Sequence, residues 1–110
     1  MSTPETKVKD RVKAEIAEAC AMHGYKARID WHAGTSFNIT LDGTGCIAGH
    51  PVVIEIKRLD KKGKVTARQK MNLKEFRDAG AAAFLIDSEE ALAGFRVWLH
   101  TLTPRTAYYG

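Results

Sequence analysis

The segment Pro51–Lys57, which reads Pro-Val-Val-Ile-Glu-Ile-Lys, constrains the fold of this chain more than any other. Its valines and isoleucines are β-branched, and such a short apolar run is typical of a buried strand. Side chains alternate along a strand, so Glu55 and Lys57 are expected on the same face. Because an unpaired charge is costly to desolvate, a buried strand must give these two a partner. The segment predicts either a local ion pair between them or a site that uses both.

Length and composition are those of one small globular domain. The chain has 110 residues, of which 45% are hydrophobic, enough for a single core. We expect one domain over 1–110, with its core at about 3–100 and a tail at 101–110. No apolar run approaches a membrane span and no signal peptide is recognised, so a cytoplasmic protein is expected. Cys20 and Cys46 lack metal-ligand spacing and are expected to be reduced.

Positive charge is concentrated in one part of the chain. The net charge is only +4, but seven cations and a single acid, Asp60, lie between Lys57 and Lys70. Such a cluster suits a nucleic-acid backbone, and a solvated loop is the alternative. The candidate DNA-binding residues are Arg58, Lys61, Lys62, Lys64, Arg68 and Lys70.

Periodicity and capping residues predict seven elements in the order helix, strand, strand, strand, helix, strand, helix. The expected ranges are a helix at 4–23, a strand at 25–31, a strand at 37–47 interrupted by Gly43-Thr44-Gly45, a strand at 51–57, a helix from a capping box at 66–69 to Gly80, a strand at 81–86 and a helix from 87 or 88 to about 100. The strands at 51–57 and 81–86 should be parallel because a helix connects them. These elements predict an α/β fold, a mixed sheet flanked by helices.

A turn near Gly49 would bring a second carboxylate to the first. An antiparallel hairpin centred there places Asp42 opposite Glu55 and Ile56. Carboxylates, together with the backbone carbonyl of Ile56, suit Mg²⁺ or Mn²⁺. Such a site, with Lys57 beside it, activates water and stabilises charge on a phosphodiester. The alternative is a structural Asp–Lys–Glu network.

Several motifs in this order resemble a known nuclease family. Asp42, followed thirteen residues later by Glu55-Ile56-Lys57, resembles the PD-(D/E)xK nuclease signature. More closely, the chain from about Thr3 to Ala91 is similar to the virus-type replication-repair nuclease (VRR-NUC) domain. The segments that carry the likeness are Thr3-Pro4-Glu5, Lys7-Val8-Lys9, Cys46-Ile47-Ala48-Gly49, Glu55-Ile56-Lys57-Arg58, Thr66-Ala67-Arg68-Gln69, Ala79-Gly80 and Phe84-Leu85-Ile86-Asp87-Ser88.

This resemblance implies a restriction-endonuclease-like fold and metal-dependent hydrolysis of DNA by an endonuclease. Asp42 and Glu55 would bind Mg²⁺ or Mn²⁺, and Lys57 would position or activate the attacking water. Gln69 matches a helix glutamine near the family's site, and Glu5 matches an acidic residue that can join the metal network. Single-domain members are often phage-encoded homodimers that act on branched DNA such as Holliday junctions in replication, repair or recombination.

Alternatives remain for three of these residues. Asn38 competes with Asp42 for the family's Asp position, because Phe37-Asn38-Ile39 resembles a form seen in relatives; charge and spacing favour Asp42. Gln69 also fits the third position of a capping box, and Glu5 also fits a helix N-terminus, where acids are stabilised. Two other functions stay open: a non-catalytic DNA-binding or assembly module on the same fold, and a structural protein without a nucleic-acid partner.

Overall fold

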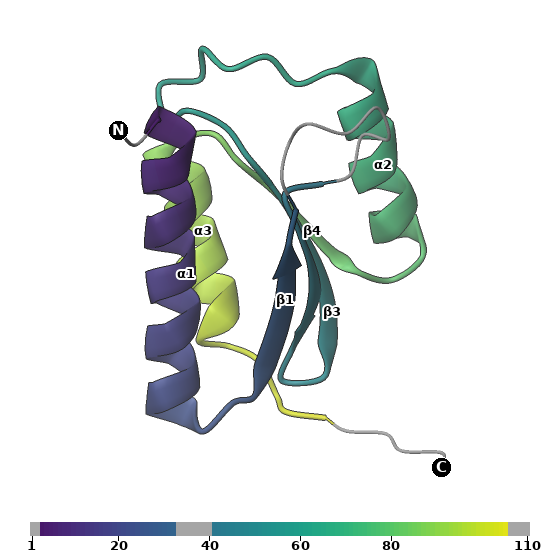
Figure 1. Cartoon of the computed structure of the whole chain (residues 1–110). Coiled ribbons are helices and arrows are strands. Elements are labelled where there is room, and N and C mark those ends of the chain that lie inside the picture. The colour runs from purple at the N-terminus through teal and green to yellow at the C-terminus, as the bar shows by residue number, and fades with distance from the viewer. Residues whose placement is uncertain (1–2, 33–40, 106–110) are drawn as a thin grey trace.

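The protein folds as a four-stranded mixed sheet with three helices (Figure 1), in a computed structural model that describes residues 3–32 and 41–105. The elements are α1 (Pro4–His23), β1 (Ala27–Trp31), β2 (Gly43–Ile47), β3 (His50–Ile56), α2 (Ala67–Asp78), β4 (Ala82–Ile86) and α3 (Glu89–Leu99). Their order is the predicted one, and the expected α/β class is confirmed.

The sheet has the order β1-β2-β3-β4, so β1 and β4 are its edges. β1 and β2 are antiparallel, β2 and β3 form an antiparallel hairpin, and β3 and β4 are parallel, as predicted from the helix between them. The hairpin register pairs Ile47 with His50 and Gly43 with Ile54, around a turn at Ala48 and Gly49. The position before Gly43 is therefore level with Glu55, the arrangement that the hairpin predicted.

One face of the sheet carries the core, which α1 and α3 cover (Figure 1). β3 contributes Val52, Ile54 and Ile56, so its intervening residues face the other way. α1 buries Val8, Val12, Ile16 and Ala19. The four-residue spacing of Val8, Val12 and Ile16 predicts Cys20 as the next buried position, but Cys20 is only partly buried. Phe84, Phe95 and Trp98 form an aromatic cluster with ring centroids 4.8–6.0 Å apart. This packing joins α3 to β4.

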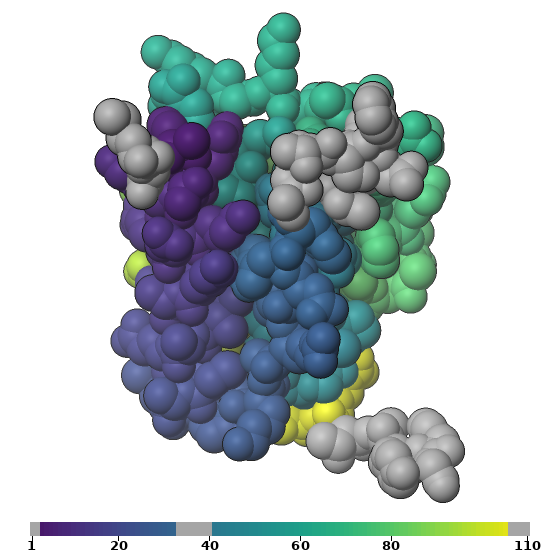
Figure 2. All heavy atoms as spheres, in the orientation of Figure 1, coloured from purple at the N-terminus to yellow at the C-terminus, as the bar shows by residue number. Residues whose placement is uncertain are grey.

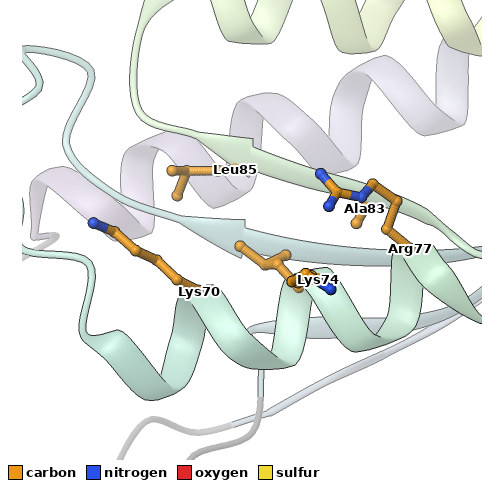
Figure 3. A pocket seen from close by; sticks show the side chains of 6 residues that line it. Lys70, Lys74, Arg77, Ala83 and Leu85 are labelled. Carbon is orange, nitrogen blue, oxygen red and sulfur yellow. The ribbon is translucent and has the colours of Figure 1, made fainter.

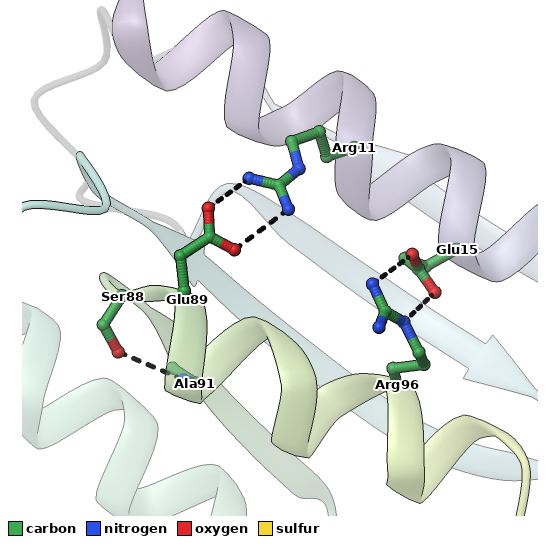
Figure 4. A network of polar contacts seen from close by, with 6 residues as sticks. All are labelled: Arg11, Glu15, Ser88, Glu89, Ala91 and Arg96. Carbon is green, nitrogen blue, oxygen red and sulfur yellow. Dashed lines mark hydrogen bonds and ion pairs between the residues drawn. The ribbon is translucent and has the colours of Figure 1, made fainter.

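Two ion pairs hold α1 against α3 at the surface (Figure 4). Arg11 donates two hydrogen bonds to Glu89 at 2.7 and 3.0 Å, and Arg96 donates two to Glu15 at 2.8 and 2.9 Å. The bond from Arg96 holds the pKa of Glu15 below its ordinary value. Paired guanidinium–carboxylate contacts of this kind fix orientation as well as charge.

The helix boundaries follow the capping residues found in the sequence. Thr3 and Ser88 accept backbone N–H bonds at the starts of α1 and α3, and Thr66 forms the expected capping box with Gln69. α2 ends at Asp78, and Gly80 follows its cap with a φ of 106°. None of the helices within 3–32 and 41–105 is long and apolar enough to cross a membrane.

The inward face expected for α2 is wrong at two positions. Its apolar spacing predicts Met71 or Leu73, then Phe76 and Ala79, as packing positions. Met71 and Phe76 are 59% and 44% exposed and α2 has no buried residue, whereas Leu73, the alternative to Met71, is partly buried. The helix lies on the sheet face away from α1 and α3 (Figure 1). On that face Val53 is buried, and Ala83 and Leu85 are only partly buried, so the contact that α2 makes with the sheet is incomplete.

The expected interruption at Gly43-Thr44-Gly45 is also wrong, because these residues begin β2. A Cβ at Gly43 would lie 2.8 Å from the Trp31 ring, and one at Gly45 would lie 1.9 Å from the Arg28 carbonyl oxygen. β1 can approach this closely only because both positions lack a side chain. The glycines are thus part of the sheet.

The first half of the expected tail packs on the hairpin. Tyr25 donates a hydrogen bond from its hydroxyl to the Leu102 carbonyl at 2.8 Å, and the Arg105 N–H donates to the Ala48 carbonyl at 2.9 Å. A Cβ at Gly49 would overlap the Arg105 carbonyl oxygen. The chain after α3 therefore closes over the β2–β3 turn.

Gly45→Ala should destabilise the protein by about 1–3 kcal/mol, because its methyl group must displace the β1 backbone. Gly94→Ala is the matched control: a Cβ there meets nothing within 4 Å inside α3, so stabilisation by about 0.5–1 kcal/mol is expected. Urea unfolding measures both. Equal effects of the two substitutions would contradict the close approach at Gly45.

Candidate active site

The β2–β3 hairpin brings Asp42 and Glu55 together on the sheet face away from the core. The Ile56 N–H donates a hydrogen bond of 2.6 Å to Asp42 Oδ2. This bond continues the hairpin one step beyond the last backbone pair, Gly43 and Ile54. It holds the Asp42 carboxylate at the end of β3, beside the Glu55 side chain.

Glu55 is a buried acid with incomplete hydrogen bonding. Its side chain is 3% exposed, and Oε2 has no hydrogen-bond partner among the described residues. Lys57 Nζ lies 4.0 Å from Glu55 Oε1, and the Lys57 side chain is 16% exposed. The Lys57 N–H donates to the Ile86 carbonyl, which keeps Lys57 in line with β3 directly after its last residue and on the Glu55 face. At this distance the Lys57 ammonium only partly compensates the charge of the buried Glu55 carboxylate.

The pKa of Glu55 is raised to about 8. Burial is the largest cause, followed by a hydrogen bond with Asp42 and by the negative charge of Asp42; the Lys57 ammonium opposes the shift. Two acids in one partly dry site cannot both ionise freely unless a cation joins them. Strong shifts of this kind are typical of functional sites, although structural networks also produce them.

The donor set fits a hard divalent cation. Glu55 Oε2 is a buried oxygen that has no partner in the part of the chain that the structure describes, and Asp42 adds a second carboxylate beside it. The Ile56 carbonyl belongs to the same strand end. Within 3–32 and 41–105 there is no group of three His, Cys, Asp or Glu side chains that could bind a metal. Mg²⁺ often uses one or two carboxylates and completes its shell with water and substrate oxygens, so two suffice.

The remaining candidates for the site are placed differently. Gln69 Oε1 accepts a hydrogen bond from the Thr66 N–H at 3.0 Å, so its amide serves the α2 capping box. Glu5 is exposed in the first turn of α1. Asn38, the alternative to Asp42, lies outside the described residues.

The basic loop, residues 58–64, makes hydrogen bonds within itself and to the start of α3. Asp60 accepts hydrogen bonds from Arg58 at 2.7 Å and from the Lys62 N–H at 3.0 Å, and these bonds lower its pKa. The Lys61 N–H donates to the Asp87 carbonyl at 3.2 Å, which ties the loop to the start of α3. Figure 2 shows this loop projecting at the upper edge of the molecule. The candidate cations Arg58, Lys61, Lys62, Lys64, Arg68 and Lys70 are all exposed.

Thr44 is a neighbour of the site that the sequence reasoning missed. His32 Nε2 and Thr44 Oγ1 are 3.0 Å apart, and the His32 N–H donates to the Asp42 carbonyl at 2.8 Å. Both side chains therefore stand beside Asp42. Alternation from Asp42 places Thr44 on the same face, but the flanking glycines obscured that signal.

Glu55→Gln should remove one contribution to the pH dependence of the free energy of unfolding. The unfolded Glu55 loses its proton near pH 4.5, whereas the folded one retains it to about pH 8. The stabilisation that comes from the raised pKa of Glu55 is thus fully present below pH 4.5 and is lost as pH rises to about 8. In EDTA, urea unfolding from pH 5 to 8 should show wild-type stability falling relative to Glu55→Gln. A constant difference between the two proteins would contradict the buried, protonated state.

Comparison with known proteins gives no relative for this chain. No protein-family model matches it, and neither a curated protein nor a solved structure is similar enough to match.

Proposed function

We propose that this protein is a Mg²⁺- or Mn²⁺-dependent DNA endonuclease with a restriction-endonuclease-like fold of the VRR-NUC type. The observation that carries the proposal is the buried Glu55, which has one oxygen without a partner among the described residues, an adjacent Asp42 and a nearby Lys57. A purely structural ion pair does not need a second carboxylate that raises the pKa of the first.

Each side chain has a defined role in this proposal. Asp42 and Glu55 hold the cation, with the Ile56 carbonyl as a further ligand. When bound, the ion would supply an activated water and would stabilise negative charge on the phosphoryl oxygens. Glu55 gives up its proton when it becomes a ligand. Lys57 orients the attacking water, because its ammonium lies 4.0 Å from the Glu55 carboxylate on the same face.

Two further residues extend the site. Glu5 lies in the first turn of α1. α1 begins at the end of the sheet where β3 and β4 finish (Figure 1), which is compatible with an acid that joins the metal network. Gln69 is the third residue of α2, and its side-chain carbonyl oxygen already accepts a hydrogen bond in the capping box. Its role in catalysis is therefore limited to its amide nitrogen or to keeping α2 in place.

The basic loop supplies the DNA contacts. Its exposed cations, together with Arg68 and Lys70 on α2, follow Lys57 directly in the chain. A DNA backbone bound to them would run close to Asp42 and Glu55. Contacts with phosphates position a nucleic acid without reading its sequence. The proposed substrates are accordingly branched DNAs, chosen by shape, which a homodimer would engage with two sites.

Purified protein should cut DNA in Mg²⁺ or Mn²⁺ and not in EDTA. Four-way junction, flap and linear duplex substrates test the preference for branches, and light scattering tests the dimer. Glu55→Gln and Lys57→Ala should each lower the cleavage rate by about a hundredfold or more, because they remove a ligand and the water-orienting cation. The exposed controls Glu90→Gln and Lys26→Ala should cleave as wild type.

Asp42→Asn and Asn38→Ala decide which residue fills the family's Asp position. Loss of cleavage only in Asp42→Asn supports Asp42; loss only in Asn38→Ala overturns its assignment. DNA binding that weakens with salt, survives Glu55→Gln and yields no product with any metal would identify a non-catalytic module instead.

A further inference from the structure

A cavity beside the candidate site is assigned no role by the proposed chemistry. It lies between α2 and the edge strand β4 and has a volume of about 240 Å³ (Figure 3). Its lining has three cations on α2 and an apolar remainder: Lys70, Lys74, Arg77, Leu73, Ala83 and Leu85. Figure 3 shows the cationic side chains extending from α2, with Ala83 and Leu85 on the strand opposite.

The hollow exists because α2 does not pack as a core helix. It runs for 12 residues without a single buried one. The small side chain of Ala83 on β4 leaves space that a larger residue would occupy. An amphipathic helix ordinarily buries an apolar stripe, so this one is placed over the sheet with room beneath it.

The cavity lies beside the strand position of Glu55. β3 and β4 are parallel, and their register pairs Glu55 directly with Leu85, which lines the hollow. Ala83 precedes Leu85 by two positions and so shares its face. A ligand in the cavity would therefore lie next to the Glu55 side of the candidate site.

Charge and size indicate what the cavity takes. Lys74 and Arg77 share one acid, Asp78, at 2.6 and 3.7 Å, while Lys70 has no ion pair among the described residues. Three cations with one carboxylate leave a net positive charge, and the rest of the lining is apolar. The cavity therefore favours an anion that carries apolar groups. At about 240 Å³ the space is smaller than the roughly 300–1,000 Å³ of small-molecule sites, which suits one unit of a polymer.

We propose that this cavity binds one nucleotide of the DNA strand beside the cleaved phosphate. Lys70, Lys74 and Arg77 contact its phosphate, and its sugar and base lie on Leu73, Ala83 and Leu85. This inference rests on the proposed function for the identity of the polymer. Phosphate contacts combined with an apolar surface for the base are the usual means of holding a single strand.

Binding of a fluorescent single-stranded oligonucleotide in EDTA tests the cavity without any cleavage. Ala83→Leu fills the space and leaves the charge unchanged, so it should weaken binding about tenfold. Lys70→Gln with Lys74→Gln should lower the slope of log affinity against log salt by about 1.4, from two contacts of about 0.7 each. The control, Lys13→Gln with Lys26→Gln, removes the same charge from exposed positions elsewhere and should keep the slope. Thermal unfolding confirms that each variant is folded.

The outcomes separate this inference from the proposed function. If folded Ala83→Leu binds as tightly as wild type, or if the control pair lowers the slope equally, the cavity proposal is overturned, whatever the cleavage assays give. If wild type does not cleave DNA but Ala83→Leu still weakens binding, the cavity proposal stands and the nuclease proposal fails. Binding of thymidine 5′-monophosphate, with oligonucleotide affinity unchanged by Ala83→Leu, would identify a free nucleotide as the ligand and overturn the strand contact.

Discussion

The hydrogen bond from the Ile56 N–H to the Asp42 carboxylate is the contact on which the candidate site depends. It extends the β2–β3 hairpin past its last backbone pair and so fixes where the second carboxylate lies. A shift of one residue in this register would move Asp42 to the opposite face of the sheet. The turn at Ala48 and Gly49 prevents that shift, and the Arg105 backbone packs against it. A contact near the C-terminus thereby supports the geometry at the other end of the hairpin.

The two faces of the sheet serve different purposes. On one face, α1 and α3 bury the alternate residues of β3 and β4. Aromatic packing joins α3 to β4, and two ion pairs join α1 to α3. On the other face, α2 covers the sheet without a buried residue, and the acids, Lys57 and the cavity lie there. Side chains alternate along a strand, so Ile54 and Ile56 pack in the core while Glu55 faces the candidate site. The residues that stabilise the fold and those proposed for chemistry therefore lie on opposite faces of β3.

Glu55 is held in a costly state. Its burial and the neighbouring Asp42 favour the protonated form at neutral pH, and the approach of Lys57 does not reverse this. A cation of higher charge would relieve both the unpartnered oxygen and the repulsion between the acids. That relief is the physical reason to regard Asp42, Glu55 and Lys57 as a candidate functional site and not only as a structural ion pair. These three side chains support that assignment without a known relative.

Local signals in the sequence determined much of this fold. The caps at Thr3, Thr66 and Ser88, the stripe of α1 and the β-branched run of β3 act through neighbouring residues, which the sequence displays directly. The hairpin even placed Asp42 opposite Glu55. Only the tertiary structure decided that Gly43-Thr44-Gly45 is a strand, since its reason is the backbone of β1 across the sheet. Only the tertiary structure likewise left Met71 and Phe76 exposed and opened the cavity beneath α2, because burial depends on which elements meet and not on the order in which they occur.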